Sequence, residues 1–199
     1  MVPRTQLDQF VPVYQFREYH STRIPAQPEE IFDAIKSVTA DDIFLFRGLT
    51  WIRRLGRRGP ASILNPPAHQ PILDVATNTS FVLLANQPNR KIVVGTVVIA
   101  PHRWRLSERP TPQEFKSLRA PGFALAAMNF LIERESAAEH VLSTETRIFA
   151  TSASARLRFA AYWVAIYPGS ALIRRMWLRA IALRAQRKTL TGAGRYSSA

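Results

Sequence analysis

Apolar residues in this chain follow the alternating spacing of strands in its middle and the wider spacing of helices near its ends. Segments rich in β-branched and aromatic residues predict five strands, at residues 11–25, 80–85, 91–99, 123–133 and 140–149. The turn sequence Asn86-Gln87-Pro88-Asn89 joins the second strand to the third, and a short segment joins the last two. Two antiparallel hairpins are therefore expected.

Helical spacing predicts three helices, at about residues 29–38, 40–55 and 152–188. Pro28 precedes the first, and its fixed φ suits a first helical turn. Thr39 and Asp42 resemble a capping box at the start of the second. The apolar stripe of the third stays in phase across Pro168 and Gly169, which predicts one long, kinked helix rather than two helices.

The remaining stretches carry weaker patterns. Segment 56–77 contains four prolines and is expected to be irregular. Residues 1–10 have little periodicity, and residues 189–199 are rich in glycine and serine. The expected organisation is therefore an N-terminal tail at 1–10, a single domain at 11–188 and a flexible C-terminal tail at 189–199.

The order of these elements predicts an α+β fold. A strand and two short helices come first, several antiparallel strands follow, and the long helix is last. An amphipathic sheet must bury one face, and the last helix is its only large partner. We therefore expect the helix to lie on the sheet, with room for a cavity between the two layers.

The amino-acid composition limits the kinds of functional site that the chain can contain. The chain has 199 residues, of which 47% are hydrophobic and 21% charged, as in an ordinary globular domain. It contains no cysteine, which excludes disulfides, thiolate catalysis and cysteine-ligated metals. The first residues lack the apolar segment of a secretory signal, so a cytoplasmic location is expected. The longest charge-free stretch, 159–173, is too short for a transmembrane segment.

The net charge of +13 favours anionic partners. Most of the excess is arginine, which a compositional bias of the genome would also produce. The cluster Arg53, Arg54, Arg57 and Arg58 has the chemistry to contact phosphates, but no recognised nucleic-acid-binding motif accompanies it. An anionic surface therefore stays open as a partner, without a strong nucleic-acid signature.

Common catalytic and cofactor motifs are missing. The sequence has no H-E-x-x-H, G-x-S-x-G, Walker or G-x-G-x-x-G pattern. Its four histidines are scattered, and no pair has metal-ligand spacing on a predicted helix. No metal and no cofactor are therefore expected.

Aromatic and apolar residues of the predicted helices and of one strand are the candidate pocket lining, with plain core packing as the alternative. These residues are Phe44, Trp51, Met128, Phe130, Tyr162, Trp163 and Ile166. A buried tyrosine hydroxyl or indole N–H needs a polar partner, and a mostly apolar pocket with a few polar groups orients a ligand in this way.

Three residues are weaker candidates for catalysis. Glu145 and Arg147 share one side of a predicted strand because alternate residues face the same way. They form either a solvent-facing row or, if that side faces the cavity, a carboxylate-binding arginine beside a general base. Tyr162 is the third candidate.

Several stretches resemble the START-like superfamily, also called the polyketide cyclase/dehydrase and lipid-transport (SRPBCC) superfamily. They are Phe16-Arg17-Glu18-Tyr19-His20-Ser21-Thr22-Arg23-Ile24, Pro28-Glu29-Glu30-Ile31-Phe32, Ala127-Met128-Asn129-Phe130, Ser143-Thr144-Glu145-Thr146-Arg147 and Phe159-Ala160-Ala161-Tyr162-Trp163. The last three are similar to stretches of uncharacterised bacterial members. The resemblance covers about residues 11–188 and implies a helix-grip fold, in which a curved antiparallel sheet wraps around the long helix and encloses a cavity.

Three functions remain open at this point. The leading one is binding of a small hydrophobic ligand, such as a lipid or polyketide, between the C-terminal helix and the sheet. The second is an enzyme of cyclase, dehydrase or hydrolase type that uses the same cavity. The third is a basic surface that binds nucleic acid or an anionic membrane.

Overall fold

The computed structural model describes residues 6–43, 65–102, 104 and 110–196, the residues from 189 onward by their backbone alone. Its elements in chain order are α1 (Leu7–Phe10), β1 (Phe16–Ile24), α2 (Pro28–Ser37), η1 (Ala40–Asp42), α4 (Ile72–Thr79), β2 (Val82–Gln87), β3 (Lys91–Ile99), α5 (Pro112–Ser117), β4 (Ala124–Arg134), β5 (His140–Ala150) and α6 (Ala153–Tyr196).

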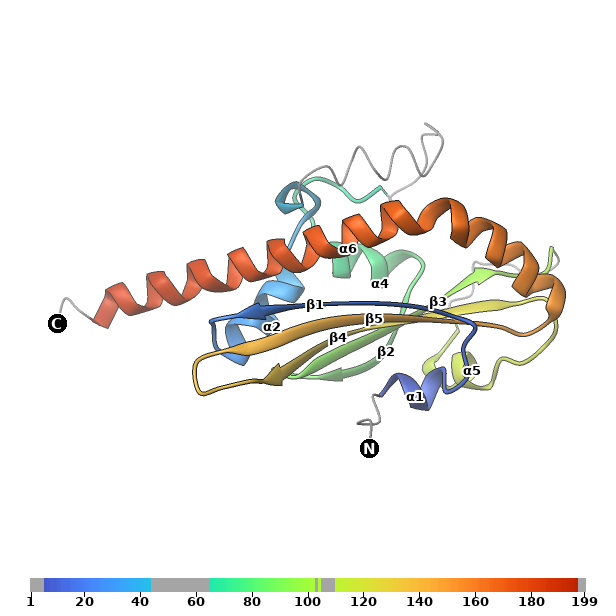
Figure 1. Cartoon of the computed structure of the whole chain (residues 1–199), viewed down its shortest axis with the longest axis horizontal. Coiled ribbons are helices and arrows are strands. Elements are labelled where there is room, and N and C mark those ends of the chain that lie inside the picture. The colour runs from blue at the N-terminus through green and yellow to red at the C-terminus, as the bar shows by residue number, and fades with distance from the viewer. Residues whose placement is uncertain (1–5, 44–64, 103, 105–109, 197–199) are drawn as a thin grey trace.

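The described strands form one curved antiparallel sheet in the order β1-β5-β4-β3-β2 (Figure 1). Both predicted hairpins, β2–β3 and β4–β5, are present. In the first, Asn89 adopts a positive φ of 60°, a conformation that asparagine tolerates better than most residues. With α6 lying along the sheet, the predicted α+β helix-grip fold is confirmed.

Helices cover both faces of the sheet (Figure 1). We call the face toward α6 the inner face; there α2, α4 and the second half of α6 form one apolar cluster with the strands. The outer face carries α1 and α5, whose Leu7, Phe10 and Phe115 pack on Val93 and Leu125. The central strands are therefore buried on both sides, which explains the long apolar runs of β3 and β4.

Helix α6 touches the sheet at two separate places. Near its start, Phe159 packs on Ile148. Further on, α6 joins the core again from Ile173. No residue of α6 between Phe159 and Ile173 is buried, although this part is rich in aromatic residues. Between these two places α6 packs less closely on the inner face, although Trp163 lies beside Phe16 of β1.

This less closely packed part of α6 coincides with a bend in the helix, visible where the ribbon changes direction (Figure 1). Pro168 lies within this segment of the helix. Proline removes one backbone hydrogen bond and its ring crowds the carbonyl four residues earlier, so a kink is the expected consequence. The prediction of one long helix with a kink at this point is confirmed.

The predicted second helix at 40–55 is corrected over its described part. There the chain forms only the 3-10 turn η1, closed by the Thr39–Asp42 capping box, and Ile43 is no longer helical. Conversely, α4 begins inside the segment expected to be irregular and runs two residues past its end, and α5 lies in the proline-containing connection between β3 and β4. Both helices are short, so each has too few residues for a helical period to be recognised in the sequence.

Helical residues fall within both predicted tails. Residues 7–10 form α1, and Leu7 is fully buried on the outer face. A single turn with two apolar residues is too short to show a helical period, which explains why the sequence pattern missed it. At the other end, the backbone of α6 continues through Tyr196, well past residue 188.

Candidate functional site

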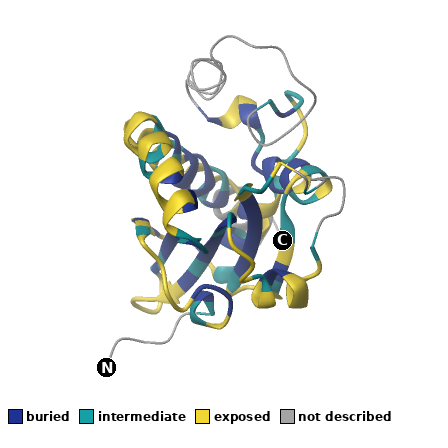
Figure 2. Cartoon of the chain, turned by 90° about the vertical axis from the view of Figure 1, so that its right-hand side faces the viewer, coloured by how far each residue is buried: buried dark blue, intermediate teal, exposed yellow. Residues whose placement is uncertain are grey.

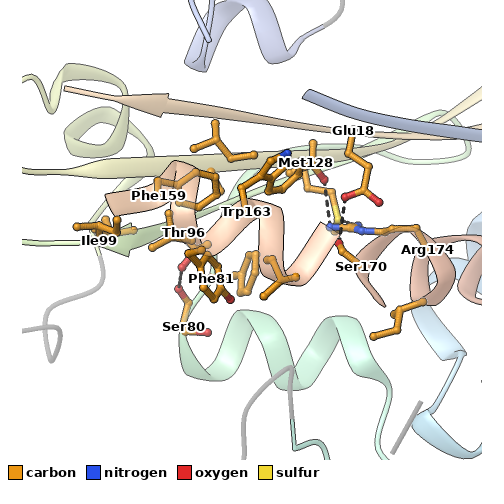
Figure 3. A pocket seen from close by; sticks show the side chains of 18 of the residues that line it. Glu18, Ser80, Phe81, Thr96, Ile99, Met128, Phe159, Trp163, Ser170 and Arg174 are labelled. Carbon is orange, nitrogen blue, oxygen red and sulfur yellow. Dashed lines mark hydrogen bonds between the residues drawn. The ribbon is translucent and has the colours of Figure 1, made fainter. Parts of the chain in front are cut away.

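A cavity of about 530 Å³ lies between the middle of α6 and the inner face of the sheet. This volume falls within the usual range for small-molecule sites. Its walls are mainly apolar and aromatic, with Phe81, Ala126, Met128, Phe159 and Trp163 among them (Figure 3). The cavity lies where α6 packs less closely on the sheet.

The residue spacing of strands and of helices explains which side chains line the cavity. In β4, alternate residues face the same way, so Ala126 and Met128 both reach the cavity. In α6, Trp163, Ile166 and Ser170 recur every three or four residues and share one helix face. The aromatic part of this wall is held by ring contacts, with the centroids of Phe159 and Trp163 5.7 Å apart.

One end of the cavity is polar. The Glu18 carboxylate reaches it from β1 and is only 4% exposed. Ser170 Oγ donates a hydrogen bond of 3.0 Å to Glu18 Oε2, and His20 Nε2 lies 3.0 Å from Glu18 Oε1. Figure 3 shows Glu18 and Ser170 side by side at this end. A carboxylate in a mostly apolar wall is costly to bury, so its position is informative.

Arg174 and Trp177 continue the polar end along α6. Arg174 Nη2 donates to Thr146 Oγ1 at 3.0 Å, and Nη1 lies against the sulfur of Met128 (Figure 3). The guanidinium carbon is 5.9 Å from the centre of the Trp177 ring. Trp177 also lines the cavity, and its indole N–H has no acceptor among the described residues.

The structure brings four of the seven predicted pocket residues to the cavity wall: Met128, Tyr162, Trp163 and Ile166. Phe130 instead packs in the core against Trp177, with ring centroids 5.2 Å apart, and does not line the cavity. Phe44 and Trp51, like the Arg53, Arg54, Arg57 and Arg58 cluster, lie outside the described residues.

Two of the predicted catalytic residues are on the wrong side of the sheet for a role in the cavity. Thr146 and Ile148 of β5 face the cavity, so Glu145 and Arg147 point to the outer face. There they are neither solvent-exposed nor near the cavity, because the N-terminal segment covers them. Of the three candidates, only Tyr162 lines the cavity.

The outer-face cluster is an ion network that holds the N-terminal segment. Arg147 Nε donates to Glu145 Oε1 at 2.8 Å, and Arg147 Nη1 donates to Asp8 Oδ1 at 2.6 Å. Arg17 Nε donates to the same Glu145 oxygen at 2.8 Å. The guanidinium of Arg147 also lies 4.7 Å from the centre of the Tyr14 ring. This network ties β5 to β1 and α1.

The network keeps its members charged. Burial by itself raises the pKa of the Glu145 carboxyl, but hydrogen bonds and positive charge from Arg17 and Arg147 outweigh it and hold the pKa below its ordinary value. Burial lowers the pKa of Arg147, yet its hydrogen bonds to Asp8 and Glu145 raise that pKa above the ordinary value. These hydrogen bonds and pKa shifts are typical of a structural ion cluster rather than of a general base.

Sequence reasoning missed Glu18, His20 and Arg174, although a signal for them existed. Phe16, Glu18 and His20 alternate along β1 and share a face, and Phe16 marks that face as apolar. Arg174 interrupts the apolar stripe of α6 between Ser170 and Trp177. A charged residue at a position that should face the interior marks either a buried pair or a ligand site.

No cluster of three or more histidine and acidic side chains suited to a metal ion is found within the described residues. His140 Nδ1 lies 2.9 Å from the backbone oxygen of Ala26, and His69 lies beside Asp41 at the surface. Within the part of the chain described, no helix combines the length and apolar composition needed to cross a bilayer.

No family model matches the chain, and no curated protein matches it. Similar solved structures include a protein from Thermus thermophilus (10% identity, TM-score 0.31, covering 87% of this chain and 99% of that one). Another is Zhui aromatase/cyclase from a Streptomyces species (12% identity, TM-score 0.30, covering 87% of this chain and 95% of that one). A third is a conserved protein from Geobacillus kaustophilus (8% identity, TM-score 0.29, covering 86% of this chain and 96% of that one). The fold assignment therefore rests on the sheet order and long helix of this chain itself.

Proposed function

We propose that this protein binds a small, largely apolar molecule between α6 and the inner face of the sheet. The observation that carries the proposal is the cavity of about 530 Å³, which lies where an aromatic-rich part of α6 packs less closely on the sheet. Its size and its mainly apolar, aromatic wall with a few polar groups are typical of small-molecule sites.

Burial of apolar surface provides the affinity. A flat molecule the size of an aromatic side chain buries roughly 200 Å², which at about 25 cal/mol per Å² gives about 5 kcal/mol before the cost of immobilising it. The order of strands and helices and the position of the cavity also support membership of the START-like superfamily, which we include in the proposal.

The proposal is tested with protein purified gently from cells. Organic extraction followed by mass spectrometry should release a bound apolar molecule, and the emptied protein should bind an uncharged fluorescent probe such as Nile red. Ala126→Phe places a phenyl ring in the cavity from the middle of the sheet and should weaken probe binding at least tenfold. Ala126 lies opposite Thr96 and Ile148, which also line the cavity from the neighbouring strands, so the new ring should extend into the cavity.

Ala161→Phe is the matched control, because Ala161 is exposed on α6 and does not line the cavity. Its probe affinity should equal that of the wild type, and thermal unfolding should show both variants folded. A folded Ala126→Phe protein that binds the probe normally, or a wild type that neither releases nor binds anything, would refute the proposal. If the extracted molecule is chemically altered on incubation with fresh protein, the cavity is that of an enzyme.

A second candidate function, docking on an anionic bilayer, is favoured by the outward side of α6. Leu157 is 75% exposed and Val164 is 76% exposed, and helical spacing places them on the same side as the exposed Arg175 and Arg179. Figure 2 shows this side of the helix exposed while the side toward the sheet is buried. Exposed apolar residues interleaved with arginines suit a lipid interface better than a nucleic acid, which offers no apolar layer.

Vesicle sedimentation tests this candidate. The protein should bind vesicles of mixed phosphatidylcholine and phosphatidylglycerol, and bind phosphatidylcholine vesicles far more weakly. Arg175→Gln with Arg179→Gln should reduce binding about thirtyfold, since each basic residue at an anionic surface contributes about 1 kcal/mol. A matched change of the exposed Leu83 on β2 to serine should have no effect. Equal binding to both kinds of vesicle, or preference for duplex DNA, would exclude bilayer docking through α6.

A further inference from the structure

The polar end of the cavity has a defined chemistry. It is formed by Glu18 from β1 and by Ser170, Arg174 and Trp177, which follow one another along α6. Glu18 and Trp177 are 4% and 3% exposed, so neither relies on bulk water for its hydrogen bonds. The rest of the wall is mainly apolar, which concentrates the hydrogen-bonding capacity of the cavity here.

Glu18 has hydrogen-bonding capacity left. A carboxylate offers about four lone-pair positions, and the described residues fill two, through Ser170 Oγ at 3.0 Å and His20 Nε2 at 3.0 Å. Buried ions are normally matched by full pairing, as Arg147 is on the other face of the sheet. Among the described residues, His20 is the ionisable side chain in contact with Glu18. The carboxylate therefore faces the cavity as an acceptor.

Trp177 points independently to a ligand. Its indole N–H has no acceptor among the described residues, although the side chain is almost fully buried and lines the cavity. A buried donor without an acceptor is unfavourable. An oxygen atom of a bound molecule would relieve that cost, and an entirely apolar ligand would not.

We propose that this end of the cavity binds the oxygen-bearing end of the ligand, and that Glu18 accepts a hydrogen bond from a ligand hydroxyl. The ligand class is thus an apolar molecule with an alcohol or phenol group at one end and an acceptor oxygen within reach of Trp177. This inference rests on the proposed function, because it specifies which apolar molecule the cavity takes. Glu18 and Trp177 are its specificity-determining residues.

Three probes of nearly equal shape test it: naphthalene, 2-methoxynaphthalene and 2-naphthol. The second offers only an acceptor oxygen, and the third offers a hydroxyl donor as well. Wild-type protein should bind 2-naphthol about tenfold tighter than 2-methoxynaphthalene, as expected for a hydrogen bond to a charged acceptor. This ratio is measured by titration calorimetry on the full chain and needs no variant.

Two variants test whether Glu18 and Trp177 produce the preference for oxygen-bearing probes. Glu18→Gln retains an oxygen that accepts from Ser170, and should reduce the preference for 2-naphthol over 2-methoxynaphthalene to about twofold. Trp177→Phe keeps an aromatic ring but lacks the N–H. It should weaken both oxygen-bearing probes about fivefold relative to naphthalene. Thermal unfolding shows whether each variant is folded.

The outcomes separate this inference from the proposed function. If 2-methoxynaphthalene and 2-naphthol bind the wild type equally well, or if Glu18→Gln keeps the full preference, Glu18 only positions α6 through Ser170 and the inference is overturned. The apolar cavity would still stand in that case. If none of the three probes binds, both the cavity function and this inference fail.

Discussion

Replacing Arg147 with methionine should lower the free energy of unfolding by about 2–3 kcal/mol, because Glu145 keeps Arg17 as a partner but loses its hydrogen bond to Arg147, and Asp8 loses its ion pair. Arg147 bridges Glu145 and Asp8, at 2.8 Å and 2.6 Å, beneath the N-terminal segment. Methionine keeps much of the side-chain length but makes none of these hydrogen bonds. Urea unfolding followed by circular dichroism measures the loss, and limited proteolysis should show earlier cleavage near α1.

Arg17→Met is the matched control. Arg17 contacts the same Glu145 oxygen, but its side chain is half exposed, so its removal should cost less than about 1 kcal/mol. Probe binding in the cavity should be unchanged in both variants, since the network lies on the opposite face of the sheet. Loss of probe binding by a folded Arg147→Met protein would restore a role for Arg147 in the site.

The difference between wild type and Arg147→Met should also depend on pH. The pKa of Glu145 is held below its ordinary value of 4.5 in the folded protein, so its ionised form stabilises the fold above that pH. As the pH falls through the folded-state pKa, Glu145 takes up a proton and loses its charge interaction with Arg147. The two unfolding free energies should therefore converge on acidification below pH 4.5.

Gly95→Ala should destabilise the protein by about 1–3 kcal/mol through overpacking. Gly95 lies on β3 beneath α5, where an added Cβ would come within 2.8 Å of Leu84 Cδ1 and 2.9 Å of two ring atoms of Phe115. Phe115 is fully buried, so its ring has little room to move. Thermal unfolding measures the effect, and Phe115→Leu in the same chain should recover part of it.

Gly169→Ala supplies the opposite control. Apart from the neighbouring backbone of α6 itself, no atom of the described residues lies within 4 Å of the Cβ that alanine would add there, and the residue is inside α6. Alanine favours the helix over glycine by roughly 0.5–1 kcal/mol, so this variant should be as stable as the wild type or slightly more stable. Equal destabilisation at Gly95 and Gly169 would argue against the tight packing of α5 on the outer face.

Periodicity along the chain was enough to predict the layers of this protein. Long segments with a clear period predicted the strands of both hairpins, the helix after β1 and the kinked α6, because each shows enough turns or alternations for a face to be recognised. The stripe of α6 likewise pointed to Tyr162, Trp163 and Ile166 as residues facing the sheet. Short elements such as α1, α4 and α5 were missed since one or two turns display no period.

The tertiary structure alone decided which polar residues meet. Alternation showed that Glu145 and Arg147 share a side, but not which side, since both faces of this sheet are covered. The kink at Pro168 was predicted, but how α6 packs on the sheet, and therefore which residues line the cavity, was decided by the tertiary structure. Glu18 and Ser170 are 152 residues apart and bond only because β1 and α6 pack together. Contacts between distant segments depend on the whole chain, and they define the candidate site.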